Sequence, residues 1–509
     1  MSKNKIIKGT LILTLAGFAT RIIGFFYRIY ISKYLGAENM GVYQLVFPVY
    51  GICFTLYASG IQTSISKLVA AQVGKGAGGT RNVKRILHVG MACSLAIACT
   101  LSLLVHFKCD FIATRLVAEP KVAPSLRVLS YVFPFCGITA VINGYYYGLK
   151  KTFVPATTQL LEQIVRVVSI YFLASAAGGG DVGLTCELAV LGLVIGELVS
   201  NLYNIISLRF GNNAKRSNEP TKLTRKRIII KDMFSLVIPL TSNRLLVSLL
   251  NSMEAILIPV MLRQAGLSSS ESLSIFGILT GMSLPFIMFP STITNSFSVL
   301  LLPTVSEAQA VDNDKLISRT TSITIKYCLI IGILSTGIFI VFGNALGTLI
   351  YHNATAGDYI VTLAWLCPFL YLTTTLASII NGLGKAYLTF VNSVIGLSIR
   401  ILFVVFIIPK EGITGYLTGL LISQLIISTL DIIAVARIIK LDISLVDCIA
   451  KPGIIIFLIS FLFSRIYTYF VHALSINALL ILAGCALFFV AAYLMLLFVT
   501  RAVTLKEFR

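Results

Sequence analysis

The chain has 509 residues and a formal net charge of +21, although 57% of its residues are hydrophobic and only 12% are charged. That balance is typical of an all-α polytopic membrane protein and excludes a soluble globular domain, which could not bury so much apolar surface. The positive charge does not indicate nucleic-acid binding. Most of the 41 Lys and Arg residues lie in loops on one side of the predicted spans, the side of the N-terminus.

Apolar segments long enough to cross a membrane follow one another along the whole chain. Each has roughly 20 residues, which spans a hydrocarbon layer of about 30 Å as a helix. We count fourteen of them, centred near Phe18, Leu56, Leu95, Ala140, Val168, Val194, Leu250, Met288, Gly332, Tyr371, Val394, Leu421, Phe461 and Phe488. The even number and the positive-inside rule predict a multi-pass cell-membrane protein with both termini in the cytoplasm.

The first span contains two arginines, Arg21 and Arg28, at a spacing of seven residues. This spacing places both guanidinium groups on one face of a helix. A charge near the centre of a bilayer costs at least about 2.5 kcal/mol, so the pair is expected to face a water-filled cavity. Such a cavity would attract anions.

The densest basic cluster, Arg209 to Lys231, separates the sixth span from the seventh. We interpret it as a cytoplasmic linker that contacts anionic lipid. The predicted organisation is an N-terminal lobe (1–210), a basic linker (211–231), a C-terminal lobe (232–440) and two additional C-terminal spans with a cytoplasmic tail (441–509).

The two predicted lobes repeat one another. The sequence around the fourth and fifth spans recurs at a shift of 234, so that Arg166 falls on Arg400, and at a shift of 223 Arg21 falls on Arg244. Each lobe therefore consists of six spans that start and end in the cytoplasm. This parity predicts a pseudo-twofold axis along the membrane normal, with the substrate between the lobes.

The repeat and the arginine pair define the candidate site. Its substrate-binding residues are Arg21, Arg28, Arg244, Arg166, Arg400 and Asn251, the last of which shares a helix face with Arg244. Three acids within spans are candidates for coupling or for arginine counter-ions, namely Glu254, Glu162 and Glu197. Glu162 lies one turn before Arg166 and could neutralise it. A fourth intramembrane acid is Asp431.

Neither an enzyme nor a metal site is predicted. The ten cysteines are scattered singly, and the sequence lacks a nucleotide-binding GxxxxGK[ST] loop and an HExxH motif. No cofactor is expected, and without ATP machinery transport would be coupled to Na⁺, H⁺ or the membrane potential.

Several motifs near the N-terminus resemble one known family. They are Lys8-Gly9-Thr10-Leu11-Ile12-Leu13, Thr20-Arg21-Ile22-Ile23-Gly24-Phe25 with Arg28, Leu35-Gly36-Ala37-Glu38, Gly41-Val42-Tyr43 and Ile65-Ser66-Lys67-Leu68-Val69-Ala70. The chain resembles the stage V sporulation protein B group, in the polysaccharide-biosynthesis branch of the multidrug/oligosaccharidyl-lipid/polysaccharide exporter superfamily. The resemblance extends to the layout of fourteen spans in two lobes.

The resemblance implies a flippase of undecaprenyl-pyrophosphate-linked saccharides, such as the lipid-linked peptidoglycan precursor lipid II, in sporulation or cell-wall synthesis. It implies cavity roles for Arg21, Arg28 and Arg244 and an acidic loop position for Glu38. Membrane lipid and cell-wall synthases are the implied partners. Two alternatives remain open at this point: an antiporter of drugs or organic cations with the same fold, and a non-transporting membrane scaffold for wall or spore assembly.

Overall fold

The computed structural model describes residues 3–74, 80–176, 184–210, 224–441, 443–473 and 477–503. Over these residues the secondary structure is 91% helix and includes no strand, which confirms the all-α prediction. Eleven helices, or twelve if one bent pair counts as a single span, are long and apolar enough to cross a membrane. The exact number of fourteen spans therefore stays a prediction.

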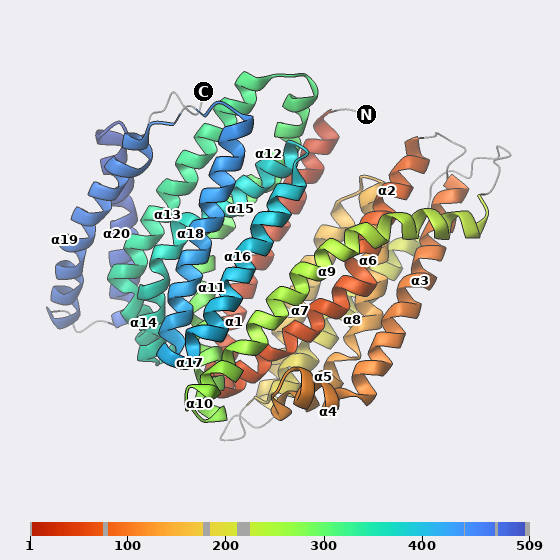
Figure 1. The fold of residues 1–509 in the computed structure, drawn as a ribbon, viewed down its shortest axis with the longest axis horizontal. Helices are drawn as coiled ribbons and strands as arrows, with labels where there is room; N and C mark the ends of the chain where they lie inside the picture. The colour runs from red at the N-terminus through yellow and green to blue at the C-terminus, as the bar shows by residue number, and fades with distance from the viewer. Residues whose placement is uncertain are drawn as a thin grey trace. The chain divides into compact units, whose positions relative to one another are not determined.

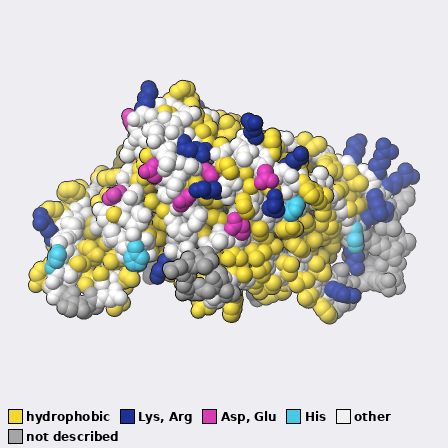
Figure 2. Space-filling view, turned by 90° about the horizontal axis from the view of Figure 1, so that it is seen from below, with side chains coloured by type: hydrophobic (Ala, Val, Ile, Leu, Met, Phe, Trp, Pro, Cys, Tyr) yellow, Lys and Arg dark blue, Asp and Glu magenta, His cyan; other side chains and the backbone are white. Residues whose placement is uncertain are grey.

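The chain divides into two compact units. The first comprises Met1–Val260 and Ser268–Gly277, and the second comprises Met261–Leu267 and Ile278–Arg509. Many large hydrophobic side chains are exposed along the helices, as expected where helices face lipid. Figure 2, which views the molecule from below, shows hydrophobic side chains together with acidic and basic ones.

The elements of the first unit begin with one very long helix. In chain order they are α1 (Lys3–Phe54), η1 (Thr55–Ser59), α2 (Gly60–Gly74), α3 (Thr80–Phe107), α4 (Cys109–Phe111), η3 (Ile112–Leu116), η4 (Pro120–Val122), α5 (Ala123–Leu129), α6 (Val132–Gly148), α7 (Phe153–Ala176), α8 (Cys186–Phe210), α9 (Lys226–Gln264) and α10 (Ser269–Gly277). Helix α9 continues past the boundary between the units, from Met261 to Gln264.

The elements of the second unit follow α9 and α10. They are η5 (Ile278–Ser283), α11 (Leu284–Met288), α12 (Ser291–Ala310), α13 (Asp314–Tyr351), α14 (Ala354–Leu363), η6 (Ala364–Leu366), α15 (Cys367–Gly382), α16 (Ala386–Phe406), α17 (Ile408–Glu411), α18 (Ile413–Ile438), η7 (Val446–Ala450), α19 (Lys451–Ala473) and α20 (Ala478–Val499). The predicted additional spans, α19 and α20, lie side by side next to α13 (Figure 1).

Helix α1 is interrupted at Gly36, whose backbone has φ 72° and ψ 175°. Glycine adopts this conformation at little cost because it has no Cβ, whereas other residues would be strained there. The helical stretch Ile12–Gly74 has 63 residues, which is long enough for two crossings. The break at Gly36 is thus the point at which the first two predicted spans separate.

Helix α9 packs against helices of the predicted N-terminal lobe. Its Ile229, Met233 and Val237 are buried in one core with residues of α2, α3 and α6. The first compact unit therefore includes most of α9, whereas the repeat assigns residues 232–440 to the second lobe; the lobe boundaries stay a prediction about the repeat. Of the predicted linker, residues 211–223 lie outside the described residues, and α9 begins at Lys226. Residues 504–509 of the predicted tail lie outside them too.

Candidate functional site

Arg21 and Arg28 are both exposed on α1, and they lie on one stripe of the helix as predicted. The neighbouring stripe is packed: Tyr27 and Ile31 are buried, and Gly24 lies against Gln163 of α7. Among the described residues no hydrogen bond or ion pair engages either guanidinium group. The two guanidinium groups therefore have hydrogen-bond donors available to a ligand, and they lie next to the buried face of α1.

Arg244 of α9 is held by the end of the π-helical segment η1. Its Nη1 donates to the carbonyl oxygen of Ser59 at 2.8 Å, to Ser59 Oγ at 2.6 Å and to Thr63 Oγ1 at 3.3 Å. Hydrogen bonds that involve a charged donor are among the stronger ones in proteins. The side chain is exposed nonetheless, so one edge of the guanidinium group is fixed while the group remains accessible.

Two further candidates on α9 differ in exposure. Asn251 is exposed two turns after Arg244, and its Nδ2 donates to the carbonyl oxygen of Val247 at 2.9 Å. Glu254 is only 5% exposed. Between them, Ser252 Oγ donates to the carbonyl oxygen of Pro48 at 3.1 Å and ties α9 to α1. Asn251 thus shares the accessible face of Arg244, and Glu254 does not.

Arg166 forms an ion pair with Glu162 one turn before it on α7. Its Nη1 is 3.5 Å from Gln163 Oε1. Glu197 of α8 is buried close enough to this pair to interact electrostatically with both members, and Thr139 Oγ1 donates to its Oε2 at 3.5 Å. Glu162 therefore acts as a counter-ion for Arg166, as its spacing suggested, and the group carries one more acid than base.

The structure places the candidates in two groups. Arg21, Arg28, Arg166 and Arg244 all belong to the first compact unit. Arg400 belongs to the second, where it is partly buried on α16.

Sequence reasoning missed the residues that hold the candidates in place. Ser59 and Thr63 are far from Arg244 in the chain and contact it only through the packing of α9. Their only local signal is a hydroxyl on successive turns of an apolar segment, which is common in membrane helices and not specific. Thr139, the partner of Glu197, lies on a different helix from it and has the same weak signal.

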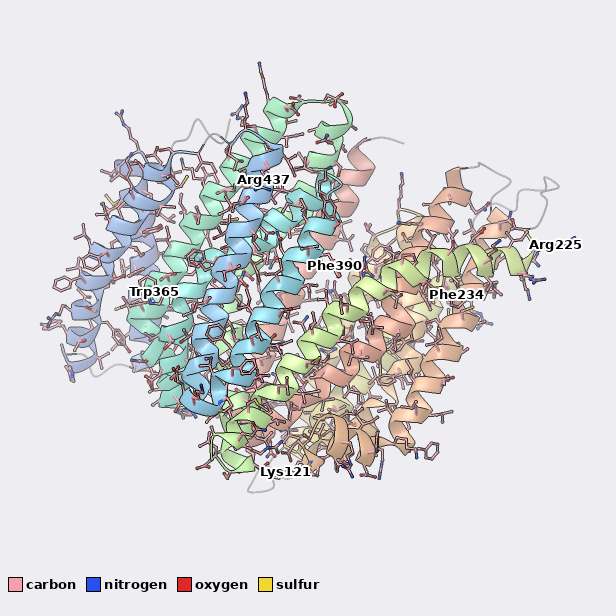
Figure 3. All side chains as sticks on the ribbon, viewed as in Figure 1. Lys121, Arg225, Phe234, Trp365, Phe390 and Arg437 are labelled. Carbon is pink, nitrogen blue, oxygen red and sulfur yellow. The ribbon has the colours of Figure 1, made fainter. Side chains whose placement is uncertain are left out.

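Glu38 lies just after the Gly36 break and forms an ion pair with Lys121. It also accepts a hydrogen bond from Ser270 Oγ at 2.5 Å. Figure 3 shows Lys121 at the end of the first unit opposite to Arg225, which precedes α9. Glu38 therefore joins three segments at that end. Its partners there are Lys121 and Ser270, which are not among the candidate substrate-binding residues.

The comparisons with known proteins agree with this architecture. The polysaccharide biosynthesis protein family matches residues 6–309. The chain is 26% identical to the stage V sporulation protein B of Bacillus subtilis strain 168, over 100% of this chain and 98% of that protein. It is 23% identical to the lipid II flippase MurJ of the same organism, over 78% of this chain and 76% of that protein.

Solved structures share the fold at low sequence identity. A lipid II flippase MurJ in an inward closed conformation superposes with a TM-score of 0.71 at 16% identity, covering 96% of this chain and 98% of that one. An inward-facing multidrug resistance MATE family transporter of the MOP superfamily gives 0.63 at 16% identity, over 84% and 97%. These folds are those of membrane flippases and transporters and not of enzymes. The chain is thus a multi-pass membrane protein that belongs to the polysaccharide biosynthesis protein family.

Proposed function

We propose that this protein flips undecaprenyl-pyrophosphate-linked saccharides across the cell membrane by alternating access, with the lipid-linked peptidoglycan precursor as the leading candidate cargo. The relatives include a lipid II flippase and a sporulation protein, and the fold is shared by flippases and by multidrug transporters. Fold alone does not choose between an anionic lipid-linked sugar and an organic cation, so the charges of the site must decide.

The observation that carries the proposal is the state of Arg21 and Arg28. Both are exposed on one stripe of α1, and among the described residues neither is neutralised by an acid. Arg166, in contrast, has Glu162 beside it. Guanidinium groups bind phosphate oxygens through two parallel charge-assisted hydrogen bonds, which suits a pyrophosphate. An organic cation would be repelled by the same pair.

The second candidate function is the export of organic cations. It is favoured by the buried carboxylate of Glu254 and by the likeness to MATE transporters, which extends over most of the chain. The described part of the first span supplies two arginines and no acid to such a substrate, and this favours the flippase. A scaffold without transport would gain nothing from unpaired charge at membrane depth.

The orientation, the energy source and the partners of the transporter belong to the same proposal. The basic cluster before α9 favours cytoplasmic termini by the positive-inside rule. Energy would come from Na⁺, H⁺ or the membrane potential, and cell-wall synthases would supply or receive the lipid. Arg244 and Asn251 of the first unit would add to the anion-binding surface of Arg21 and Arg28, and Arg400 of the second unit stays a separate candidate for the same substrate.

A transport assay in liposomes separates the two candidates. The purified protein is reconstituted and presented with a fluorescent undecaprenyl-pyrophosphate sugar or with an ethidium-like cation, with and without imposed Na⁺, H⁺ and potential gradients. We expect flipping of the lipid-linked sugar and no movement of the cation. Robust cation transport with no flipping would replace the proposal by the antiporter, and no transport of either would favour the scaffold.

A further inference from the structure

Two buried polar side chains meet inside the second unit. Asn392 of α16 donates from Nδ2 to Oδ1 of Asp431 on α18 at 2.7 Å. Asp431 is 1% exposed and Asn392 is 7% exposed. Neither is one of the candidate substrate-binding residues, and the proposed function assigns no role to them.

The first unit has a hydrogen bond at the equivalent place. Thr158 of α7 donates from Oγ1 to Asn204 Oδ1 on α8 at 2.7 Å. Thr158 falls on Asn392 at the same shift of 234 that relates Arg166 to Arg400. Asn204 falls on Asp431 at a shift of 227, and at that shift GLVIGEL at 192–198 corresponds to GLLISQL at 419–425. Helices α8 and α18 are therefore repeat partners at a shift of 227.

A second pair of contacts supports this register independently. Glu197 of α8 accepts a hydrogen bond from Thr139 at 3.5 Å. Gln424, its partner at the shift of 227, donates to Thr373 at 2.9 Å, and Thr373 is the partner of Thr139 at the shift of 234. The close approach of the helices repeats as well, because Gly192 lies against α7 and Gly419 against α16.

The repeat thus contains two pairs of equivalent polar positions on α8 and α18, and each pair has an acid in one unit only. In the first pair, α8 has Glu197 where α18 has the neutral Gln424. In the second pair, α18 has Asp431 where α8 has the neutral Asn204, which is 0% exposed. Since Thr158 and Asn204 pack there with no charge, the fold does not need a carboxylate at this place. The packing of these helices therefore does not explain why position 431 is an acid.

The helices packed against α18 bring few charges to Asp431. They are α14, α15, α16, α17 and η6. Their charged and titratable residues, with those of α18 itself, are Asp358, Tyr359, Cys367, Tyr371, Tyr387, Arg400, Lys410, Glu411, Tyr416 and Arg437. Within the described structure, Asn392 is the residue among these helices that hydrogen-bonds Asp431.

The basic residues of this set lie away from the acid along the helices. Arg400 is eight positions from Asn392, or roughly 12 Å along α16 at about 1.5 Å per residue. Arg437 is exposed, and it follows Asp431 by six positions, or about 9 Å, on another face of α18. Figure 3 labels Phe390 and Arg437, which mark the parts of α16 and α18 that carry the pair. A buried ionised carboxylate with only an amide partner would be strongly disfavoured.

We propose that Asp431 is a proton-binding site of the second unit and that Asn392 positions its carboxyl group. One carboxyl oxygen accepts the amide hydrogen of Asn392, and the other carries the proton. A metal cation would need a cage of several oxygen ligands. Here the amide presents its nitrogen to the carboxylate, and no group of three His, Cys, Asp or Glu that could hold a metal occurs in the described part of the chain.

In the transport cycle, which rests on the proposed function, Asp431 takes up a proton from water when the second unit opens and releases it as a hydrated proton on the other side. The carboxylate forms one O–H bond on uptake and breaks it on release. No other reactant is required. Protonation lowers the free-energy cost of burying the carboxyl group. The packing of the second unit around Asp431 therefore depends on whether Asp431 carries a proton.

Infrared spectroscopy of the purified protein tests the site without any substrate. Within the range from about pH 5 to pH 8, the wild type should show the C=O stretch of a protonated carboxyl group that D431N lacks and that shifts on exchange into D₂O. In N392A the same band should remain and move to higher frequency, because the hydrogen bond is lost. The exposed Glu411→Gln serves as the control and should leave the band unchanged. D431N recreates the neutral Asn of the first unit and is therefore expected to fold.

Absence of a difference band between wild type and D431N from about pH 5 to pH 8 would overturn the proposal, as would a band that appears only when Na⁺ is removed. The second arm measures flipping of a lipid-linked sugar against pH. D431N should lose the pH dependence that the wild type shows in this range, whereas E411Q keeps it. If the infrared band is present and flipping is absent in the wild type, the proton site stands and the flippase proposal fails.

Discussion

Arg166 pairs with Glu162 one helical turn away on α7, whereas its repeat partner Arg400 has Gly396 in that position. The two arginines are therefore equivalent in the repeat, but the acid that precedes Arg166 by one turn has no counterpart one turn before Arg400. Glu162→Gln should leave Arg166 without its ion-pair partner and destabilise the protein by about 1.5–3 kcal/mol. Thermal unfolding in detergent measures this loss.

The double variant E162Q/R166M provides the matched control, since it removes both partners of the direct ion pair. It should be more stable than E162Q alone, which is the pattern expected when one partner of a partly buried ion pair is deleted. Equal melting of the single and double variants would show that the pair does not contribute.

Arg244 should depend on the hydroxyl of Ser59. Ser59→Ala removes the acceptor at 2.6 Å and leaves the carbonyl oxygen at 2.8 Å, so a loss of roughly 0.5–1.5 kcal/mol in unfolding free energy is expected. In a double-mutant cycle with R244A, the serine substitution should have no further effect. Strictly additive losses in that cycle would contradict the contact.

The close approach of α1 and α10 should not tolerate a methyl group at Gly41. A Cβ there would clash with the carbonyl oxygen of Leu273, which is backbone and cannot rotate away. Gly41→Ala should therefore lower thermal stability markedly. Gly17→Ala on the same helix meets no atom within 4 Å and should be neutral or stabilising by up to about 1 kcal/mol. Equal effects of the two substitutions would refute this account of the interface.

Membrane topology can be tested with single cysteines at the two ends of the first unit. Lys121 and Arg225 lie at opposite ends of it (Figure 3). In intact cells a membrane-impermeant thiol reagent should label K121C, whereas R225C should be labelled only after the membrane is permeabilised. Labelling of R225C from outside would reverse the orientation and the assignment of both termini to the cytoplasm.

The sequence predicted the helical class because apolar segments of this length have few other folds available to them. It also predicted the contact between Glu162 and Arg166, since residues four apart on one helix must be neighbours. It could not predict that Ser59 holds Arg244, because that contact depends on how η1 packs against α9. The equivalence of Asn204 and Asp431 in the repeat could not be seen from a single shift, because the register changes between the repeats. At a shift of 234, Asp431 aligns with Glu197 instead.

The central claim is that Arg21 and Arg28 bind the pyrophosphate during flipping. The direct measurement is the initial rate of flipping of a fluorescent undecaprenyl-pyrophosphate sugar in liposomes with R21A, R28A and the double variant. Arg225→Ala, which removes an exposed arginine before α9, is the matched control. Each lost charge-assisted interaction is worth about 1.5–3 kcal/mol, so each single variant should flip roughly 10- to 100-fold more slowly, and R225A should match the wild type. Wild-type rates in both single variants and in the double variant would contradict the account.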